Sequence, residues 1–128
     1  MAAKKAVDDR VEQWRELLAT HARTTCELDR ELHQHGLGAS DFEVLDRLAD
    51  ADSSCRVQEL SGRVHLSQSA LSRLIARLEK DGLVTRGMCS SDRRGVQVAL
   101  TDKGRELHAR VRPLQRAVLE RMLGGTED

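Results

Sequence analysis

The chain of 128 residues has almost no aromatic side chains, with one Trp, one Phe and no Tyr. Its core must therefore be built from Leu, Val and Ala, and we expect those residues to lie on helices. No apolar run is long enough to span a membrane, and the N-terminus has no signal-like apolar segment. We accordingly expect no membrane partner and a cytoplasmic location.

Cysteine and glycine patterns that would carry chemistry are also missing. Three cysteines in a chain without a secretory segment argue against a disulfide framework. No Cys/His spacing suits a zinc site, no GxSxG motif occurs, and no glycine-rich phosphate loop is present. The sequence therefore predicts no metal, no cofactor and no catalytic residue, so we expect that the protein is not an enzyme.

The formal net charge is zero, which taken alone argues against a nucleic-acid partner. The charges are unevenly distributed, however. Residues 1–55 carry 7 basic and 12 acidic side chains, whereas residues 56–95 carry 8 basic and 4 acidic ones. Residues 56–95 are therefore the candidate segment for contact with phosphates.

Residues 67–82 have the pattern of a helix with one apolar and one polar face. Ser67 is the predicted N-cap and Gly82 the predicted stop. The residues at helical spacing on the predicted buried face are Leu71, Leu74, Ile75 and Leu78. The opposite face carries Gln68, Ser69, Ser72, Arg73, Ala76 and Lys80. Such a face can approach base edges, and Arg73 is of the residue type that most often contacts guanine.

A shorter helix is predicted just before it, with Val57, Leu60 and Val64 facing inward and His65 and Leu66 in the turn. Two short helices joined this tightly are typical of a helix-turn-helix. A surface helical hairpin with ordinary solvated faces remains the alternative on this evidence alone.

A hairpin is predicted next, with strands at residues 83–88 and 96–100. The polar turn between them holds Asp92, Arg93 and Arg94. Adjacent arginines at a hairpin tip suit phosphate or minor-groove contacts better than a core. We expect Asp92 to orient a neighbouring arginine and brace the turn, although a solvated loop with an incidental ion pair would have the same composition.

These residues resemble a known family. Asp92-x-Arg94, followed after three residues by Val98-x-Leu100-Thr101, is similar to the wing signature of the MarR family of bacterial regulators. The helix-turn-helix and the segment LEKDGLV at residues 78–84 resemble that family too. The resemblance covers residues 40–107 closely and the flanking helices only in pattern.

The resemblance implies a mostly α fold with a small β-hairpin wing. It implies a homodimer in which each subunit offers a recognition helix to the major groove and a wing to the minor groove of double-stranded DNA. Arg94 would be the minor-groove residue and Asp92 its brace. The complete set of predicted DNA-binding residues is Ser67, Gln68, Ser69, Ser72, Arg73, Arg77, Asp92, Arg93 and Arg94.

The flanking segments have the patterns of helices for dimerisation. One long helix is predicted over residues 8–33, with Val7, Val11, Trp14, Leu18, His21, Leu28 and Leu32 near one stripe. Its length leaves too little partner surface within one subunit, so we expect a second subunit to cover it. Residues 1–36 and 101–128 are the predicted dimerisation helices, and residues 37–100 the predicted DNA-binding lobe, in a single compact domain.

Local signals add detail to these elements. Ser40 with Glu43 is a plausible capping box for a helix that packs Phe42, Leu45 and Leu48 inward. Thr101 is the predicted cap of the last helix, which Pro113 should kink or divide. Residues 1–6 and 124–128 are expected to fray.

Two ways of sensing a signal compete. Trp14, Arg15 and His21 would offer a planar wall, a cation and an imidazole to a small aromatic carboxylate. This is similar to family members that respond to phenolic acids, although ordinary interface packing explains the same residues. The second is oxidation of Cys26, but a buried, inert thiol is expected there, while Cys55 and Cys89 are expected in loops.

The sequence thus predicts a transcriptional repressor that an aromatic carboxylate releases from a pseudo-palindromic operator. A thiol-oxidation-sensing repressor and a winged helix used only for protein interaction are the alternatives.

Overall fold

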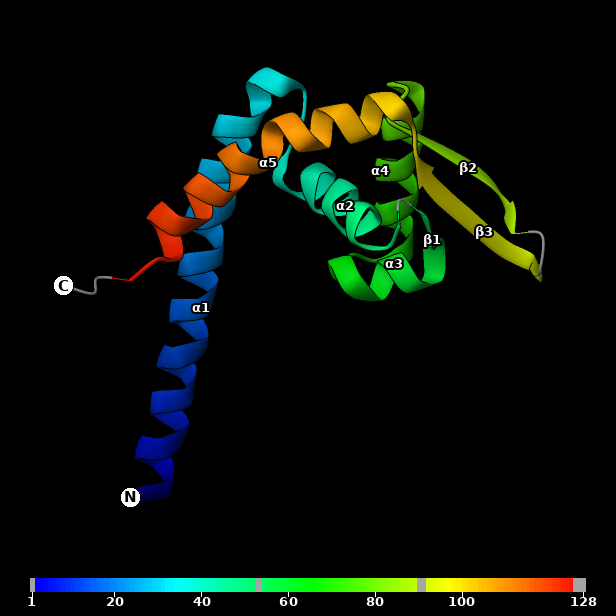
Figure 1. The fold of residues 1–128 in the computed structure, drawn as a ribbon. Helices are drawn as coiled ribbons and strands as arrows, with labels where there is room; N and C mark the ends of the chain where they lie inside the picture. Colours follow the sequence, from blue (N-terminus) through cyan, green and yellow to red (C-terminus); the bar gives the residue numbers. More distant parts are fainter. Residues whose placement is uncertain (1, 53, 90–91, 126–128) are drawn as a thin grey trace.

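The computed structural model describes residues 2–52, 54–89 and 92–125, with only the backbone described at residues 88–89 and 92–94. These residues form five α-helices and a small antiparallel sheet, whose β2–β3 hairpin projects from the side opposite α1 (Figure 1). The helices are α1 (Ala2–Leu32), α2 (Ala39–Asp50), α3 (Val57–Val64), α4 (Gln68–Lys80) and α5 (Asp102–Leu123), with a 3-10 turn η1 (His33–His35) after α1. The strands are β1 (Ser54–Arg56), β2 (Val84–Cys89) and β3 (Asp92–Leu100), in the order β1-β3-β2. The predicted fold class, mostly α with a small hairpin wing, is confirmed.

The core lies where α2, α3 and α4 meet the sheet and the first half of α5. The predicted inward faces of α2 and α4 are confirmed, because Phe42, Leu45, Leu71 and Ile75 are all buried. Their fixed spacing along each helix places them on one side, and the hydrophobic effect drives that side inward. The fully buried aliphatic residues that complete this core are Leu32, Val44, Leu48, Leu60, Leu78, Val84, Val98 and Val111.

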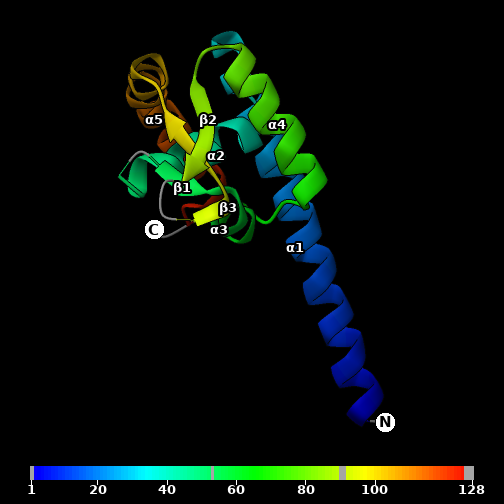
Figure 2. The ribbon, with the colours of Figure 1, turned by 90° about the vertical axis from the view of Figure 1, so that its right-hand side faces the viewer.

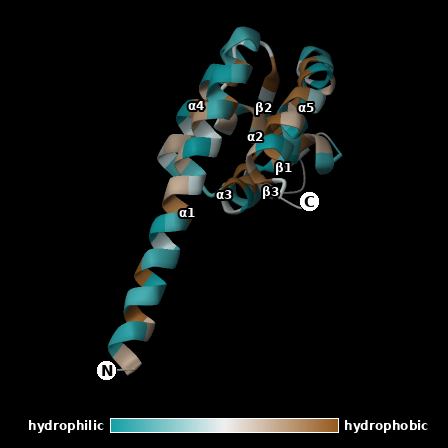
Figure 3. Cartoon of the chain, turned by 90° about the vertical axis from the view of Figure 1, so that its left-hand side faces the viewer, coloured by the Kyte–Doolittle hydropathy of each residue, from teal (hydrophilic) through white to brown (hydrophobic). Residues whose placement is uncertain are grey.

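α1 leaves this core and extends alone for most of its length (Figures 1 and 3). Its apolar stripe is exposed there, with Trp14 at 59% and Leu17 at 60% of full exposure. The C-terminal part of α1 contacts α2 and the second half of α5, where Arg121 Nη2 donates to Glu27 Oε1 at 3.0 Å. The stripe on α1 is therefore an apolar surface without a partner in the described part of the subunit.

The start of α1 corrects one prediction, because the helix begins at Ala2 and residues 2–6 are helical rather than frayed. Ala and Lys are strong helix formers, and this segment contains no residue that would stop the helix. The helix ends at Leu32, where the chain tightens into η1, and Gly36 then adopts a φ of 75°.

The capping box predicted from Ser40 and Glu43 is wrong. α2 begins at Ala39, so Asp41 occupies the third helical position, and its Oδ2 accepts a hydrogen bond from Gly38 N at 2.8 Å. A second carboxylate, Asp29 of α1, accepts from Ala39 N at 2.7 Å. These two acidic side chains satisfy backbone donors at the helix start and tie it to α1.

Pro113 lies within a single helix. α5 continues from Asp102 to Leu123, so the proline does not divide it. Figure 1 shows α5 running above α2 and then turning downward beside α1, which agrees with the predicted kink. α5 stays one helix, but its first half follows the wing and its second half lies beside α1.

The sheet and the cysteines differ from prediction in three ways. β1 was not predicted, because its three residues have no apolar alternation and are held by pairing with β3. Residues 92–95, predicted as turn, belong to β3. Cys55 is buried in β1 rather than exposed in a loop, and Cys26 is exposed on α1 rather than buried.

Candidate nucleic-acid interface and pocket

α4 is a capped helix that presents a polar face to solvent. Ser67 Oγ accepts from Ala70 N at 3.2 Å, as predicted for an N-cap. The turn before it is set by His65, whose φ is 57°, and by Ser61 Oγ, which donates to Leu66 O at 3.1 Å. Gly82, with a φ of 79°, follows the helix as predicted. Both predictions for the helix ends are confirmed.

The exposed face of α4 is the predicted polar one, formed by Gln68, Ser69, Ser72, Arg73, Ala76 and Lys80. An α-helix with side chains is about 10–12 Å wide, close to the roughly 12 Å width of the major groove of B-DNA. The N-terminus of α4 also adds a partial positive charge on the side of Gln68 and Ser69. The size, polarity and charge of this face all suit a nucleic-acid groove.

Arg77, predicted to bind DNA, has a partner inside the subunit. Its guanidinium forms an ion pair with Asp41 of α2, whose side chain is 8% exposed. Asp41 is the same carboxylate that caps α2 through Gly38 N. The structure therefore brings Arg77 to the start of α2 with 56% of its side chain still exposed, and Arg73, one turn earlier, is exposed as well.

The hairpin of β2 and β3 projects from the lobe beside α4 (Figure 2). The predicted residues Asp92, Arg93 and Arg94 lie in β3, and their side chains lie outside the described part of the structure. The backbone pairing is antiparallel from Val84 with Leu100 to Met88 with Val96, and an irregularity between Met88 and Cys89 precedes the tip. The strand places these three residues at the far end of the wing.

The base of the wing, meaning Asp81, Gly82, Leu83 and the segment 101–104, is tightly bonded. Thr101 Oγ1 donates to Gly82 O at 2.6 Å and accepts from Gly104 N at 3.0 Å, as predicted for the cap of α5. Thr101 N donates to Leu83 O at 3.1 Å. These bonds fix the hairpin to the end of α4, so the two elements keep one relative orientation.

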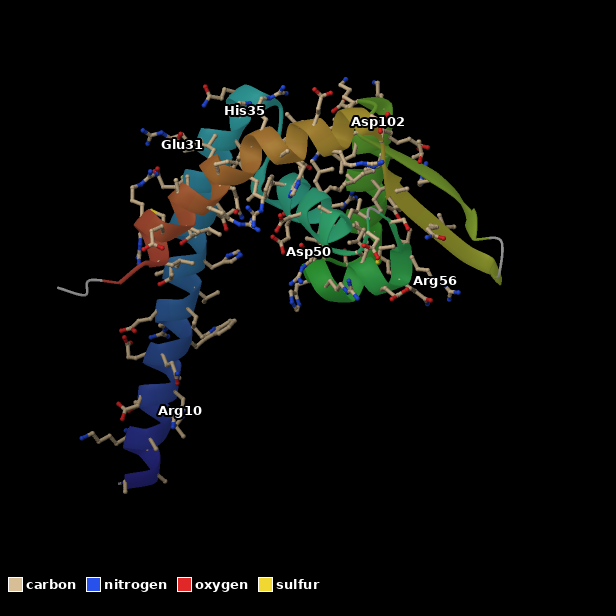
Figure 4. All side chains as sticks on the ribbon, in the orientation of Figure 1. Arg10, Glu31, His35, Asp50, Arg56 and Asp102 are labelled. Carbon is tan, nitrogen blue, oxygen red and sulfur yellow. The ribbon has the colours of Figure 1, made fainter. Side chains whose placement is uncertain are left out.

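Sequence reasoning missed two arginines on this side of the molecule. Arg56 (labelled in Figure 4) and Arg86 line a groove of about 560 Å³ between α3, α4 and the wing, together with Gln68 and Ser72. Arg86 pairs with Glu79 of α4, with Nη2 at 2.9 Å from Oε1. The basic excess of residues 56–95 was the signal that could have identified them.

A second hollow, of about 740 Å³, lies between α1, α2 and the turn from α3 to α4. We call it the inter-helix pocket. Its ionisable lining consists of His21, Glu43, Arg47, Arg63 and His65. Arg47 Nε lies 3.3 Å from Glu43 Oε2. With two arginines against one carboxylate, the pocket has a positive balance suited to an anion.

Thr24 gives this pocket an unusual polar feature. The residue is only 8% exposed, and its Oγ1 has no hydrogen-bond partner within the described part of the chain. Leaving a buried hydroxyl unsatisfied costs about 1–3 kcal/mol. A polar atom of a bound molecule would remove that cost, since Thr24 lines the pocket.

The three residues predicted to bind an effector do not come together in one cavity. His21 lines the inter-helix pocket, whereas Trp14 and Arg15 are absent from its lining. Arg15 Nη1 lies 3.7 Å from Glu12 Oε1 on the free part of α1, and both side chains are mostly exposed. Among the described residues, the arginines that line this pocket together with His21 are Arg47 and Arg63.

The remaining site predictions concern thiols, metals and membranes. Burial raises the pKa of the Cys55 thiol, and the nearby Glu59 adds to this effect, so Cys55 is a poor nucleophile. Across residues 2–52, 54–89 and 92–125, no cluster of His, Cys, Asp and Glu is arranged to hold a metal ion. Among those same residues, no helix has both the length and the apolarity needed to cross a bilayer.

The chain is similar to known proteins in both sequence and fold. The sequence profile of the MarR family matches residues 37–96, which run from the start of α2 into β3. YkoM, an HTH-type transcriptional regulator of Bacillus subtilis, is 28% identical over 96 residues, which are 75% of this chain. The chain spans 62% of the length of that relative.

Solved structures show the same fold. AbsC, a MarR family transcriptional regulator from Streptomyces coelicolor, is 33% identical with a TM-score of 0.82, covering 91% of this chain and 79% of that one. Sco3205, a MarR family transcriptional regulator from the same organism solved in complex with DNA, is 29% identical with a TM-score of 0.84. That match covers 94% of this chain and 77% of Sco3205.

Proposed function

Because the chain belongs to the MarR family of winged-helix transcriptional regulators, we propose that it is a cytoplasmic, homodimeric repressor that binds a pseudo-palindromic operator. The observation that carries this proposal is the pairing of α4, capped and polar on its exposed face, with a wing fixed beside it at Thr101. Sco3205, a protein of the same fold, was solved in complex with DNA, which supports DNA as the partner.

In this proposal α4 enters the major groove and the wing reaches the adjacent minor groove. Arg73 contacts a base edge, and Gln68, Ser69 and Ser72 contact bases and phosphates near the start of α4. Ser67 caps the helix at the groove. In the wing, Arg94 and Arg93 contact the minor groove and backbone while Asp92 braces the turn. Arg77 contacts a phosphate with the exposed part of its guanidinium while one nitrogen stays paired with Asp41.

The partner for the apolar stripe of α1 is a second copy of the chain. Val7, Val11, Trp14, Leu17 and Leu18 are between 37% and 60% exposed in one subunit. An apolar stripe of this kind on one long helix is typical of a helix-helix interface. A dimer would place the two copies of α4 for successive half-sites, about 34–36 Å apart along the DNA.

The test is selection of duplexes from a randomised pool by the wild-type chain, followed by sedimentation of the complex. We expect an inverted repeat with half-sites about 10–10.5 base pairs apart and two chains per duplex. Enrichment of a single half-site with one chain would contradict the dimer. No salt-dependent enrichment at all would favour the protein-interaction alternative, since phosphate contacts release counterions.

We also place the effector site in the inter-helix pocket and propose a small aromatic carboxylate, such as a phenolic acid, as its ligand. The pocket volume of about 740 Å³ lies within the usual range for small-molecule sites, roughly 300–1,000 Å³. Arg63 and Arg47 would hold the carboxylate, His21 and Thr24 would bond to a ring substituent, and Leu17 lies on the apolar wall.

This location explains how the ligand could release DNA. The pocket is walled by α1, which forms the proposed dimer, by Arg63 at the end of α3, and by His65 in the turn that leads to α4. A ligand that prefers one separation of these walls shifts the position of α4 relative to α1. The two recognition helices of the dimer would then no longer match both half-sites.

The effector test uses salicylate and 4-hydroxybenzoate as probes, read by the melting temperature and by release of the selected duplex. A ligand that binds the native state raises the melting temperature. We expect Arg63→Gln to lose both responses, while Arg15→Gln, which removes the same charge outside the pocket, keeps them. If Arg15→Gln loses the responses and Arg63→Gln keeps them, the ligand lies on the free part of α1.

A further inference from the structure

A buried charge cluster joins α2 to both halves of α5 and has no part in the contacts described above. Asp46 of α2 is 9% exposed. Its Oδ1 lies 2.7 Å from His108 Nε2, and its Oδ2 accepts from Arg116 Nη1 at 3.2 Å. Arg116 Nη1 also donates to Gln115 Oε1 at 2.8 Å. One carboxylate thus binds two side chains of the same helix.

The cluster is held in a defined position by packing. The ring of His108 stacks on Phe42 of α2, with centroids 5.3 Å apart and planes 17° from parallel. Burial alone would raise the pKa of Asp46, but the hydrogen bonds from His108 and Arg116 outweigh it, so the pKa is lowered. Asp46 is therefore an anion that is bonded through both of its carboxylate oxygens.

The two partners of Asp46 lie on opposite sides of the kink in α5. His108 lies before Pro113 and Arg116 lies after it, roughly two turns further along the helix. A proline removes one helical hydrogen bond and opens a kink. Asp46 bonds to both sides of that kink, so it opposes any change in the angle between the two halves of α5.

The two halves of α5 belong to different parts of the molecule. The first half begins at the base of the wing, where Lys103 Nζ donates to Asp81 O at 2.9 Å. The second half packs along α1, through the Arg121 and Glu27 pair and the buried Val118. The angle between the two halves of α5 at Pro113 therefore sets the orientation of the winged lobe, residues 37–100, relative to the helices of the proposed dimer.

We infer that Asp46 is a positioning residue that fixes the separation of the two recognition helices in the dimer. The inference rests on the proposed function, because it requires a dimer on two half-sites. Its consequence is selectivity for half-site spacing: a dimer with an intact Asp46 cluster accepts one spacing, and a dimer without it tolerates several.

The test compares the duplex selected by the wild-type chain with duplexes in which two central base pairs are inserted or removed. Each base pair changes the half-site separation by about 3.4 Å. We expect the wild type to lose roughly tenfold or more in affinity on either change, comparable to one mismatched base pair. The affinity of Asp46→Asn and of Arg116→Gln for these altered duplexes should fall by less than about threefold. Without the cluster the angle at Pro113 can change, so the two lobes can adjust to a different half-site separation.

The control is Glu27→Gln, which breaks an ion pair of α5 on one side of Pro113 only. It should keep the wild-type spacing preference. If Asp46→Asn does not fold, the spacing preference of Arg116→Gln tests the inference, since in that variant Asp46 keeps its bond to His108. A cluster with a merely structural role would lower the melting temperature of both variants and leave the spacing preference unchanged, which overturns the inference.

Failure of the proposed function gives a different result. If the wild-type chain binds DNA as a monomer or not at all, affinity does not depend on half-site spacing for any variant. If the wild type is selective for spacing and Asp46→Asn and Arg116→Gln are equally selective, the proposed function stands and the role of Asp46 is refuted.

Discussion

Replacing Gly104 by Ala tests whether the base of the wing is as tight as the structure has it. A Cβ built at Gly104 would lie 2.1 Å from Leu83 O and 3.1 Å from Leu83 C, where real contacts keep at least 3.0 Å. Leu83 O is backbone, so it can move only by displacing the start of the wing. The same oxygen accepts the hydrogen bond from Thr101 N at 3.1 Å.

The expected cost combines opposing effects. Moving the Leu83 carbonyl by about 1 Å loses one hydrogen bond, about 1 kcal/mol, and adds the strain of overpacking, about 1–3 kcal/mol. Replacing Gly by Ala within a helix raises the free energy of unfolding by about 1 kcal/mol, because Ala has the higher helix propensity. The free energy of unfolding should therefore fall by roughly 1–3 kcal/mol, which lowers the melting temperature by about 4–12 °C in a domain of this size.

The measurement is thermal and urea unfolding, with Gly62→Ala as the matched control. Gly62 lies within α3 and a Cβ there would have no neighbour within 4 Å. Gly62→Ala should leave stability unchanged or raise it by up to about 1 kcal/mol. The reasoning is refuted if Gly104→Ala is as stable as the wild type, or if both substitutions destabilise the protein equally.

Three further outcomes are expected. Because the pKa of Asp46 is lowered in the folded chain, its contribution to stability is present above the ordinary carboxyl pKa of about 3.9 and is lost as the pH falls through the folded value. The urea midpoint of the wild type should thus fall more steeply on acidification below about pH 5 than that of Asp46→Asn, and parallel curves would contradict this. Arg94→Ala should weaken DNA binding for all sequences and reduce the salt slope by about 1, and an unchanged slope would exclude a phosphate-neutralising role. Peroxide should not release DNA from the wild type; release that Cys26→Ser abolishes would establish the thiol alternative instead.

The elements predicted correctly from the sequence are those with local causes. The buried stripe of α4, its cap at Ser67 and its stop at Gly82 all depend on residues within the same helix or next to it. The cap of α5 at Thr101 is local as well. A period of 3.6 residues and a capping side chain are visible in any single sequence, so these features needed no knowledge of the fold.

The elements that were missed depend on distant partners. β1 is a strand only because β3 pairs with it, from Ser54 with Ala99 to Arg56 with Gln97. Arg77 meets a carboxylate 36 residues away, and His108 meets one 62 residues away. No periodicity or spacing rule connects such residues, because the tertiary fold alone brings them together.

The proposed effector site shows the same limit. The sequence indicated Trp14, Arg15 and His21 because they follow one another on α1, but a cavity needs walls from several elements. In the structure only His21 of these three lines the inter-helix pocket, and its cations come from Arg47 of α2 and Arg63 of α3. Neighbours along one helix were a poor guide to neighbours around a cavity.

The central claim, that α4 recognises bases in the major groove, is tested most directly by selecting duplexes with the wild type, Arg73→Ala and Arg10→Ala. Arg10 lies on the free end of α1 (Figure 4), so its loss removes the same charge far from α4. We predict that Arg73→Ala weakens binding to the selected duplex by about 1–3 kcal/mol and loses preference at one base pair of each half-site. Arg10→Ala should keep both affinity and preference. Unchanged affinity and unchanged base preference in Arg73→Ala would contradict the assignment of α4 as the recognition helix.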